Sequence, residues 1–207
     1  MTNTFTQQEE QILEKGFEEI AQIGAKSFTV ESLAGRLGMS KKTIYKYFPT
    51  KEKLIRKIII FITEQIESKF NKICETEKNS ALQFVKVMEH ISKFTSRAPI
   101  HLMAQVKTAY PSVWKEIETF RLKRQESFFT ILKMAQEQNL ARKDIDMKKF
   151  SIVFMNMINN TFQPEFFLHN DLAVGETINA LTKIISRGIF TSKGLEAIQQ
   201  YYEKQTY

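Results

Sequence analysis

The chain has 207 residues and a formal net charge of +7, and its 43% of hydrophobic residues can bury a core in one large or two small domains. Its single cysteine, Cys74, excludes an intrachain disulfide and is typical of a reducing cytosol. The N-terminal residues lack the apolar core of a signal peptide, and the longest strongly apolar run, residues 58–62, is too short to cross a bilayer. These features predict a cytoplasmic protein with no membrane partner.

The distribution of glycine indicates an all-α fold. None of the seven glycines lies between residues 39 and 174, although hairpin turns depend on glycine, and this stretch is rich in good helix formers. Apolar spacing and capping residues predict helices at about 6–24, 29–38, 40–47, 50–76, 80–95, 98–108, 111–138, 146–163 and 171–190, and a tail helix from 194. Residues 139–144 and 166–171 are predicted to be loops.

The positive charge is concentrated in one short segment. Residues 36–57 contain eight basic residues and one acid, a net charge of +7 that equals the charge of the whole chain. The remaining residues balance at 22 basic and 22 acidic. A chain with all its excess charge on one helical segment is expected to dock that segment on a polyanion, most plausibly duplex DNA.

The same segment has the pattern of a helix-turn-helix. Thr29 is a suitable N-cap for a short amphipathic helix, which Gly38 ends while making the turn. Ser40 caps the second helix, and Pro49 stops it. In such a unit the second helix enters the major groove with its first residues at the base edges.

The second helix is expected to turn Ile44 and Phe48 inward and its remaining side chains toward DNA. Of these, Lys42, Thr43 and Lys46 suit base edges, while other lysines and the tyrosine hydroxyls suit phosphates. The helix starts at 29 and 51 suit phosphates as well. The predicted DNA-contacting residues are Thr29, Ser40, Lys41, Lys42, Thr43, Tyr45, Lys46, Tyr47 and Lys51. The ordered succession of cap, turn, cap and stop disfavours the alternative of a merely solvated basic face.

Residues 12–54 resemble the N-terminal domain of TetR-family transcriptional regulators. The matching elements, in the family order and without a gap, are Ile12-Leu13, Gly24, Thr29-Val30, Leu33-Ala34, Gly38, residues 40–48 and residues 51–54. Met39 and Lys42 are mild departures, and Lys42 adds a positive charge at the groove. The resemblance implies an all-helical homodimer, with a helix-turn-helix domain at 1–50 and a ligand-binding and dimerisation domain at 51–207.

No catalytic or metal-binding constellation is apparent. His90, His101 and His169 each lack the glutamate three residues earlier that a di-iron bundle requires, and a single cysteine with scattered histidines offers no zinc spacing. Neither a glycine-rich phosphate loop nor a nucleophile elbow is present. The sequence therefore predicts a protein that is not an enzyme and that needs no cofactor or metal.

Aromatic and methionine side chains crowd the C-terminal part, where they either line an adaptable apolar pocket or form ordinary core. A pocket would take a small hydrophobic or amphipathic ligand, with His90, His101 or Tyr110 as a polar anchor. The expected pocket residues are Phe61, Phe84, Met88, His90, Phe94, His101, Tyr110, Trp114 and Phe128.

The helices predicted at 146–163 and 171–190 are strongly apolar, which suits a four-helix dimer interface, although intrachain core is the alternative. The expected interface residues are Phe154, Met157, Ile158, Phe162, Ile178, Leu181 and Ile185.

Two functions are compatible with these features. The first is a homodimeric repressor that a ligand releases from its operator. The second is a DNA-bound scaffolding protein of the same fold without a small-molecule effector, and an enclosed pocket would distinguish the first from the second.

Overall fold

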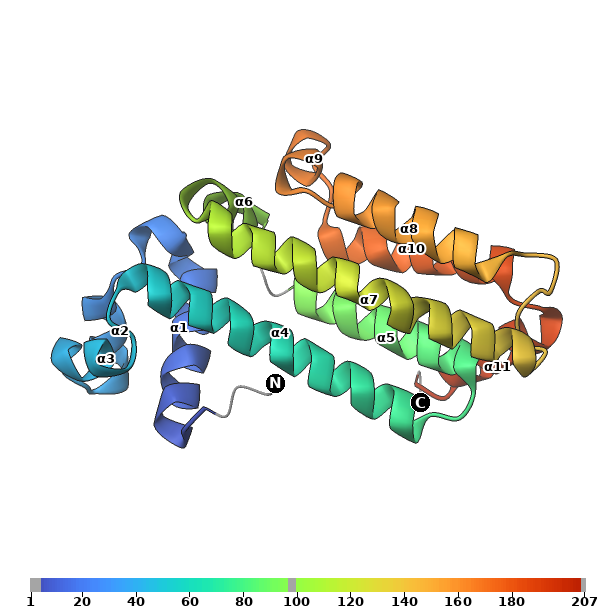
Figure 1. Ribbon diagram of the computed structural model, residues 1–207, viewed down its shortest axis with the longest axis horizontal. Helices are drawn as coiled ribbons and strands as arrows, with labels where there is room; N and C mark the ends of the chain where they lie inside the picture. Colours follow the sequence, from blue (N-terminus) through green and yellow to red (C-terminus); the bar gives the residue numbers. More distant parts are fainter. Residues whose placement is uncertain (1–4, 97–99, 206–207) are drawn as a thin grey trace. The chain divides into compact units, whose positions relative to one another are not determined.

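The structure, a computed structural model, describes residues 5–96 and 100–205, and these residues form an all-α protein, as the sequence predicts (Figure 1). The helices are α1 (Gln7–Ser27), α2 (Val30–Leu37), α3 (Lys41–Tyr47), α4 (Lys51–Thr76), α5 (Ser80–Thr95), α6 (Ile100–Ala109), α7 (Pro111–Glu137), α8 (Met147–Thr161), α9 (Pro164–His169), α10 (Val174–Ile189) and α11 (Ser192–Glu203). Among the described residues, β-pairing is limited to an isolated antiparallel bridge between Ala141 and Phe190.

Most predicted helix bounds agree with the structure to within a few residues, and α5 has the predicted bounds. The predicted start of the 98–108 helix lies outside the described residues. The predicted loop at 166–171 was wrong in its first part, because α9 occupies Pro164–His169. Pro164 favours a helix start, and Phe167, which is 2% exposed, anchors the short helix to the core.

The end of α1 also differs from the prediction. Gly24 breaks the helix at φ +82° and ψ 156°, but one further helical turn follows it to Ser27. Ala25 and Phe28, which are 1% and 0% exposed, hold this turn against the core. A glycine can therefore interrupt a helix without ending it when apolar residues on both sides are buried.

The chain divides into two compact units, which are described separately. The first comprises residues up to Glu67 together with the α6 segment as far as Ile117, and the second comprises Ser68–Ser96 and Glu118 onward. The division falls inside α4, whose first residues Leu54, Ile55 and Ile58 are buried in the first unit. The assignment of function to 1–50 and 51–207 stays a prediction.

The first unit is built around the helix-turn-helix. Its α1 packs against α2 and α6, and α2 packs against α3. Ile12, Leu13 and Leu33 are fully buried, as a three-helix DNA-binding domain of this size requires for its stability. The buried residues of this unit that the structure describes include a polar one, Glu19, which is 1% exposed and was not predicted to face the core.

The second unit has an aromatic interior. The ring of Phe84 on α5 lies 5.8 Å from that of Phe128 on α7 and 5.5 Å from that of Phe190, and Phe128 stacks on Phe154 of α8 at 5.0 Å. Helix α5 also packs against α10 and α11. These contacts join helices that are distant in sequence into one core.

A hydrogen bond fastens the C-terminal helix to this core. The Tyr201 hydroxyl of α11 donates to Glu89 Oε2 of α5 at 2.9 Å. Burial, together with Glu89, raises the pKa of Tyr201 to about 12, so the neutral phenol that donates this bond persists in the folded protein.

Across the described ranges 5–96 and 100–205, every helix is too short or too polar to cross a membrane.

Candidate nucleic-acid interface

The turn between α2 and α3 is made by local interactions of the predicted residues. Gly38 adopts the left-handed conformation at φ +62°, and Met39 N donates to Ala34 O at 2.9 Å, which closes the end of α2. Ser40 then caps α3, because its hydroxyl accepts from Thr43 N at 3.0 Å. The Ser40 and Thr43 hydroxyls are also hydrogen-bonded to each other at 2.8 Å, so both side chains are held at the start of α3.

Helix α3 has one buried side and one open side. Ile44 is 0% exposed and Phe48 is 3% exposed, so the predicted inward residues do anchor the helix. Lys41, Lys42 and Lys46 are exposed on the other side. Thr43, Tyr45 and Tyr47 are half-buried between them. The first turn of α3 thus offers ammonium and hydroxyl groups, which are the groups that read base edges and bind phosphates.

Lys41 has an acidic partner that the sequence did not suggest. Its ammonium donates to Glu31 Oε1 in the first turn of α2, and it also lies over the Tyr45 ring, 5.6 Å from the centroid. The hydrogen bond lowers the pKa of Glu31 and raises the pKa of Lys41, so both groups stay charged near neutral pH. A phosphate that binds Lys41 must therefore displace Glu31 or share the ammonium with it.

Tyr47 and Lys51 also have protein partners. The Tyr47 hydroxyl donates to Gln8 Oε1 at 2.6 Å, which ties the end of α3 to the start of α1. Lys51 Nζ lies 3.5 Å from Lys26 O and 5.8 Å from the centroid of the Phe28 ring. The sequence could not reveal these partners, because Gln8 and Lys26 are far from α3 and α4 along the chain.

Thr29 and Thr50 act as N-caps, and their hydroxyls accept from Ser32 N and Lys53 N at 3.1 Å each. The nine residues predicted to contact DNA all belong to the first unit, on α3 or at the starts of α2 and α4. Their contacts with DNA stay a prediction. Glu31 and Gln8, the hydrogen-bond partners of Lys41 and Tyr47, were not singled out from the sequence.

The residues predicted to line a ligand pocket are distributed over both units. Phe61, His101, Tyr110 and Trp114 belong to the first. Phe84, Met88, His90, Phe94 and Phe128 belong to the second, where the rings of Phe84 and Phe128 are in contact. Phe84 and Phe128 are 1% and 7% exposed. Such burial is expected both of ordinary core residues and of residues in a pocket wall, so it does not distinguish the two alternatives.

The residues predicted to form a dimer interface differ in exposure. Phe154, Phe162 and Ile178 are 6%, 8% and 5% exposed, so they belong to the core of their own chain. Met157 is 40% exposed, while Ile158, Leu181 and Ile185 are half-buried. Three further apolar residues are exposed on the same helices, at 45%, 67% and 67%, and they are Ile152, Val153 and Ile184.

Comparisons with known proteins agree with this geometry. Residues 12–58 match the family described as "Bacterial regulatory proteins, tetR family". Over 190 residues, 91% of this chain and 99% of its relative, the protein is 24% identical to the uncharacterized HTH-type transcriptional regulator YvaF of Bacillus subtilis. It is also 34% identical to the nucleoid occlusion factor SlmA of Aliivibrio fischeri, but over only 76 residues, 37% of this chain and 39% of SlmA.

Solved structures show the same fold along nearly the whole chain. A transcriptional regulator from Cytophaga hutchinsonii superposes with a TM-score of 0.72 at 17% identity, over 90% of this chain and 100% of the other. A regulator from Saccharomonospora viridis, solved in complex with choline, superposes with a TM-score of 0.65 at 14% identity, over 89% of this chain and 98% of the other. The all-α architecture with an N-terminal helix-turn-helix is thus common to these proteins.

Proposed function

We infer that the chain belongs, through residues 12–58, to the TetR family of bacterial regulatory proteins and carries the DNA-binding helix-turn-helix of that family. From this premise we propose that it is a homodimeric, sequence-specific repressor that a small ligand releases from its operator.

One observation carries the proposal: the first turn of α3 is open to solvent and basic, while its other side is anchored by Ile44 and Phe48. The buried pair holds the helix as a rigid element that fits the major groove. Lys42 and Thr43, early in the helix, are the proposed base-reading residues. Lys46 was predicted to suit base edges, but it lies in the last turn of α3, so it is proposed as a phosphate contact together with Lys41 and Lys51.

The experiment is a salt titration of DNA affinity, with the fragment just upstream of the protein's own coding region as the first operator tested. Three lysine–phosphate contacts per subunit give six in a dimer, so the logarithm of affinity should fall against the logarithm of salt concentration with a slope of roughly −5. Lys46→Ala should make the slope shallower by about 2, since it removes one contact in each subunit. Lys193→Ala, an exposed lysine on α11, serves as the control. A slope near zero for the wild type would sink the DNA assignment.

Dimerisation is proposed through α8 and α10. Both helices expose large apolar side chains, with Val153 and Ile184 each 67% exposed. An exposed apolar face of this kind stabilises a helical dimer when a second copy covers it. The buried residues Phe154, Phe162 and Ile178 support these helices from within, and they are not proposed to touch the partner.

A ligand-responsive body is proposed for the second unit. Its aromatic interior, from Phe84 to Phe154, can repack around a hydrophobic or amphipathic molecule. The regulator of similar fold that was solved with choline gives a precedent for a small molecule in such a protein. A thermal-shift screen of hydrophobic and amphipathic compounds tests this, because a ligand of the folded state raises the melting temperature. Hits that leave operator affinity unchanged would remove the effector role.

A DNA-bound scaffolding protein is the second candidate, because SlmA, the nucleoid occlusion factor, is the more identical of the two relatives. That similarity covers 76 residues, whereas the similarity to the transcriptional regulator YvaF covers 190. The part of the chain outside the helix-turn-helix, which would carry a scaffolding role, is therefore similar to the regulator YvaF and not to SlmA. Binding at many dispersed chromosomal positions, measured by chromatin immunoprecipitation, would favour the scaffold, and binding at one or a few promoters would favour the repressor.

A further inference from the structure

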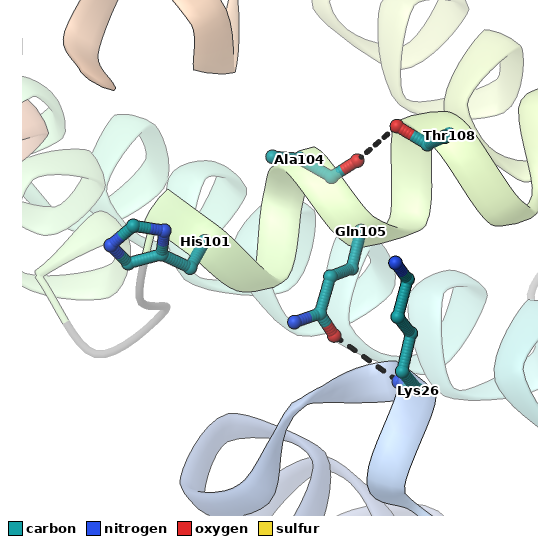
Figure 2. Close-up of a pocket in the computed structure, with 5 residues that line it drawn as sticks. All are labelled: Lys26, His101, Ala104, Gln105 and Thr108. Carbon is teal, nitrogen blue, oxygen red and sulfur yellow. Dashed lines mark hydrogen bonds between the residues drawn. The ribbon is translucent and has the colours of Figure 1, made fainter.

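One hollow in the first unit is not used by the proposed function. It has a volume of about 230 Å³ and lies between the end of α1 and one side of α6 (Figure 2). Four of its lining residues follow one another on α6 at the spacing i, i+3, i+4 and i+7, which places them on a single face of that helix. The lining residues are Lys26, His101, Ala104, Gln105 and Thr108.

The shape of the hollow is fixed by the kink in α1. Gly24 turns the chain with φ +82°, and Gln105 packs against it so closely that a Cβ at Gly24 would lie 2.8 Å from Gln105 Oε1. The same oxygen accepts from Lys26 N at 3.1 Å. The amide nitrogen of Gln105 lies beside the same glycine, 3.1 Å from the position of that Cβ. The Gln105 carbonyl is therefore used by Lys26 N, while the NH₂ group keeps its donors.

The polar side chains of the lining belong to Lys26, His101, Gln105 and Thr108, and none of the five lining residues is acidic. Lys26 carries a cationic donor, and the Gln105 amide carries a neutral one. The Thr108 hydroxyl donates to Ala104 O at 2.9 Å, so these two groups are paired with each other. Figure 2 shows the Lys26 side chain rising beside Gln105 toward α6.

We propose that this hollow binds a small anion, with a carboxylate or phosphate group seated on Lys26 and Gln105. An ammonium and an amide in one recess give an anion charge-assisted hydrogen bonds, and no carboxylate in the lining opposes them. The volume is below the range of about 300–1,000 Å³ typical of drug-sized ligands, which favours a small anion. This site is separate from the aromatic interior proposed for the hydrophobic ligand.

The position of the site suggests its effect. Gln105 attaches α6 to the last turn of α1, the helix on which α2 packs. An anion that bridges Lys26 and Gln105 adds a second attachment at the same place, so it should raise the melting temperature of the protein. Any resulting change in DNA affinity must be matched by an equal change in anion affinity when DNA is bound.

The test uses the full chain and three anionic probes, which are inorganic phosphate, phenyl phosphate and benzoate, at constant ionic strength set with chloride. Binding is measured by isothermal titration calorimetry and by the shift of the His101 ring signals in NMR spectra. Lys26→Met removes the charge and keeps the aliphatic stem. Gln105→Glu keeps the oxygen that accepts from Lys26 N and adds a negative charge to the hollow. Lys107→Met, on the same helix but outside the lining, is the matched control.

We expect at least one probe to bind the wild type, and to bind Lys26→Met and Gln105→Glu at least about tenfold more weakly, the loss typical of a charge-assisted hydrogen bond. Lys107→Met should bind like the wild type. If no probe binds the wild type at ~20 mM, a level at which binding free energy is only about 2 kcal/mol, the site does not exist. An equal loss in the Lys107→Met control would also overturn the proposal, since it would indicate general charge attraction.

DNA is a second source of phosphate, and the same variants distinguish it from a free anion. If the hollow takes a DNA phosphate, Lys26→Met should lower DNA affinity and make the salt slope shallower by about 2 for the dimer. If it takes a free anion, Lys26→Met should leave DNA affinity unchanged in chloride and abolish the effect of the probes. These two comparisons depend on DNA binding. The calorimetric measurement of probe binding does not, so its result stands even if the repressor assignment fails.

Discussion

At the scale of single residues, two kinds of contact with DNA are expected, one from α3, the recognition helix, and one from the start of α4. Lys42 and Thr43 stand early in α3, where a helix in the major groove meets base edges, while Lys51 stands at the start of α4, where a helix meets the backbone. We therefore expect Lys42→Ala and Thr43→Ala to change which sequences are bound. Lys51→Ala should weaken binding to all sequences about equally.

Selection of binding sites from a random library with each variant measures this difference. The same preferred site from Lys42→Ala and from the wild type would count against base reading by Lys42. A new preferred site from Lys51→Ala would show that Lys51 does more than hold a phosphate.

The pairing of Glu31 with Lys41 gives a second prediction at this scale. Glu31 is an acid at the edge of the basic surface, and it holds the ammonium of Lys41 by a hydrogen bond. Glu31→Gln should raise affinity for every DNA sequence, because it frees Lys41 for a phosphate. It also removes a negative charge that would repel the DNA phosphates. A double-mutant cycle in fluorescence anisotropy with Lys41→Ala separates the two effects. If Glu31→Gln gives the same gain in the Lys41→Ala background as in the wild type, the ion pair has no part in DNA binding.

At the scale of elements, the two glycines at positive φ differ in their backbone conformation and in the space that a Cβ would have. Gly38, at φ +62°, makes the turn of the helix-turn-helix, and a Cβ there would meet nothing within 4 Å. Gly24, at φ +82° and ψ 156°, lies in a region that is essentially glycine-only, and a Cβ there would collide with Gln105.

Gly24→Ala should therefore lower the free energy of unfolding by about 3 kcal/mol or more, and Gly38→Ala by about 1–2 kcal/mol. Gly35→Ala is the control, because Gly35 lies inside α2 with open space around it, and alanine there should stabilise by up to about 1 kcal/mol. Chemical denaturation measures all three. If Gly24→Ala and Gly38→Ala lower the free energy of unfolding equally, the Gln105 side chain moves away from the new Cβ without a cost in free energy. The kink at Gly24 then does not hold α6 in place.

The elements were more predictable than their contacts. Caps and stops act within a few residues, so Thr29, Gly38, Ser40 and Pro49 sufficed to delimit α2 and α3. Partners that are distant along the chain, such as Gln8 for Tyr47, leave no local signal. The short α9 was missed because six residues are too few for a helical period to be visible, and its stability comes from the burial of Phe167.

The predicted dimer interface illustrates the same limit. Helix α8 carries apolar residues around most of its circumference, so periodicity could not decide which of them face the chain's own core. Phe154 proved to be buried and Val153 exposed, although they are neighbours in sequence. The orientation of Phe154 becomes visible only in its tertiary contacts, such as its stacking on Phe128 of α7.

At the scale of the whole molecule, the exposed apolar residues predict the oligomeric state. A charge at Met157 or Ile184, which are 40% and 67% exposed, would be unfavourable inside an interface but harmless on a solvated surface. Met157→Glu and Ile184→Glu should therefore give a folded monomer by light scattering, and they should lose operator binding, since two recognition helices must act at a fixed spacing.

The control is Leu122→Glu on α7, which replaces a residue of comparable exposure, 47%, on another helix. It should remain a dimer that binds its operator. Circular dichroism checks that each variant is folded. If Ile184→Glu is a folded dimer that still binds DNA, α8 and α10 do not form the interface.

The one-sided burial of α3 has a consequence for how this protein can evolve. A helix of seven residues is too short to form by itself, so its shape is maintained by Ile44 and Phe48, which face the core. The side chains that would read the operator contribute almost nothing to that anchoring. A substitution at Lys42 is therefore nearly neutral for stability, and descendants of this gene can acquire new target promoters without first passing through a poorly folded intermediate.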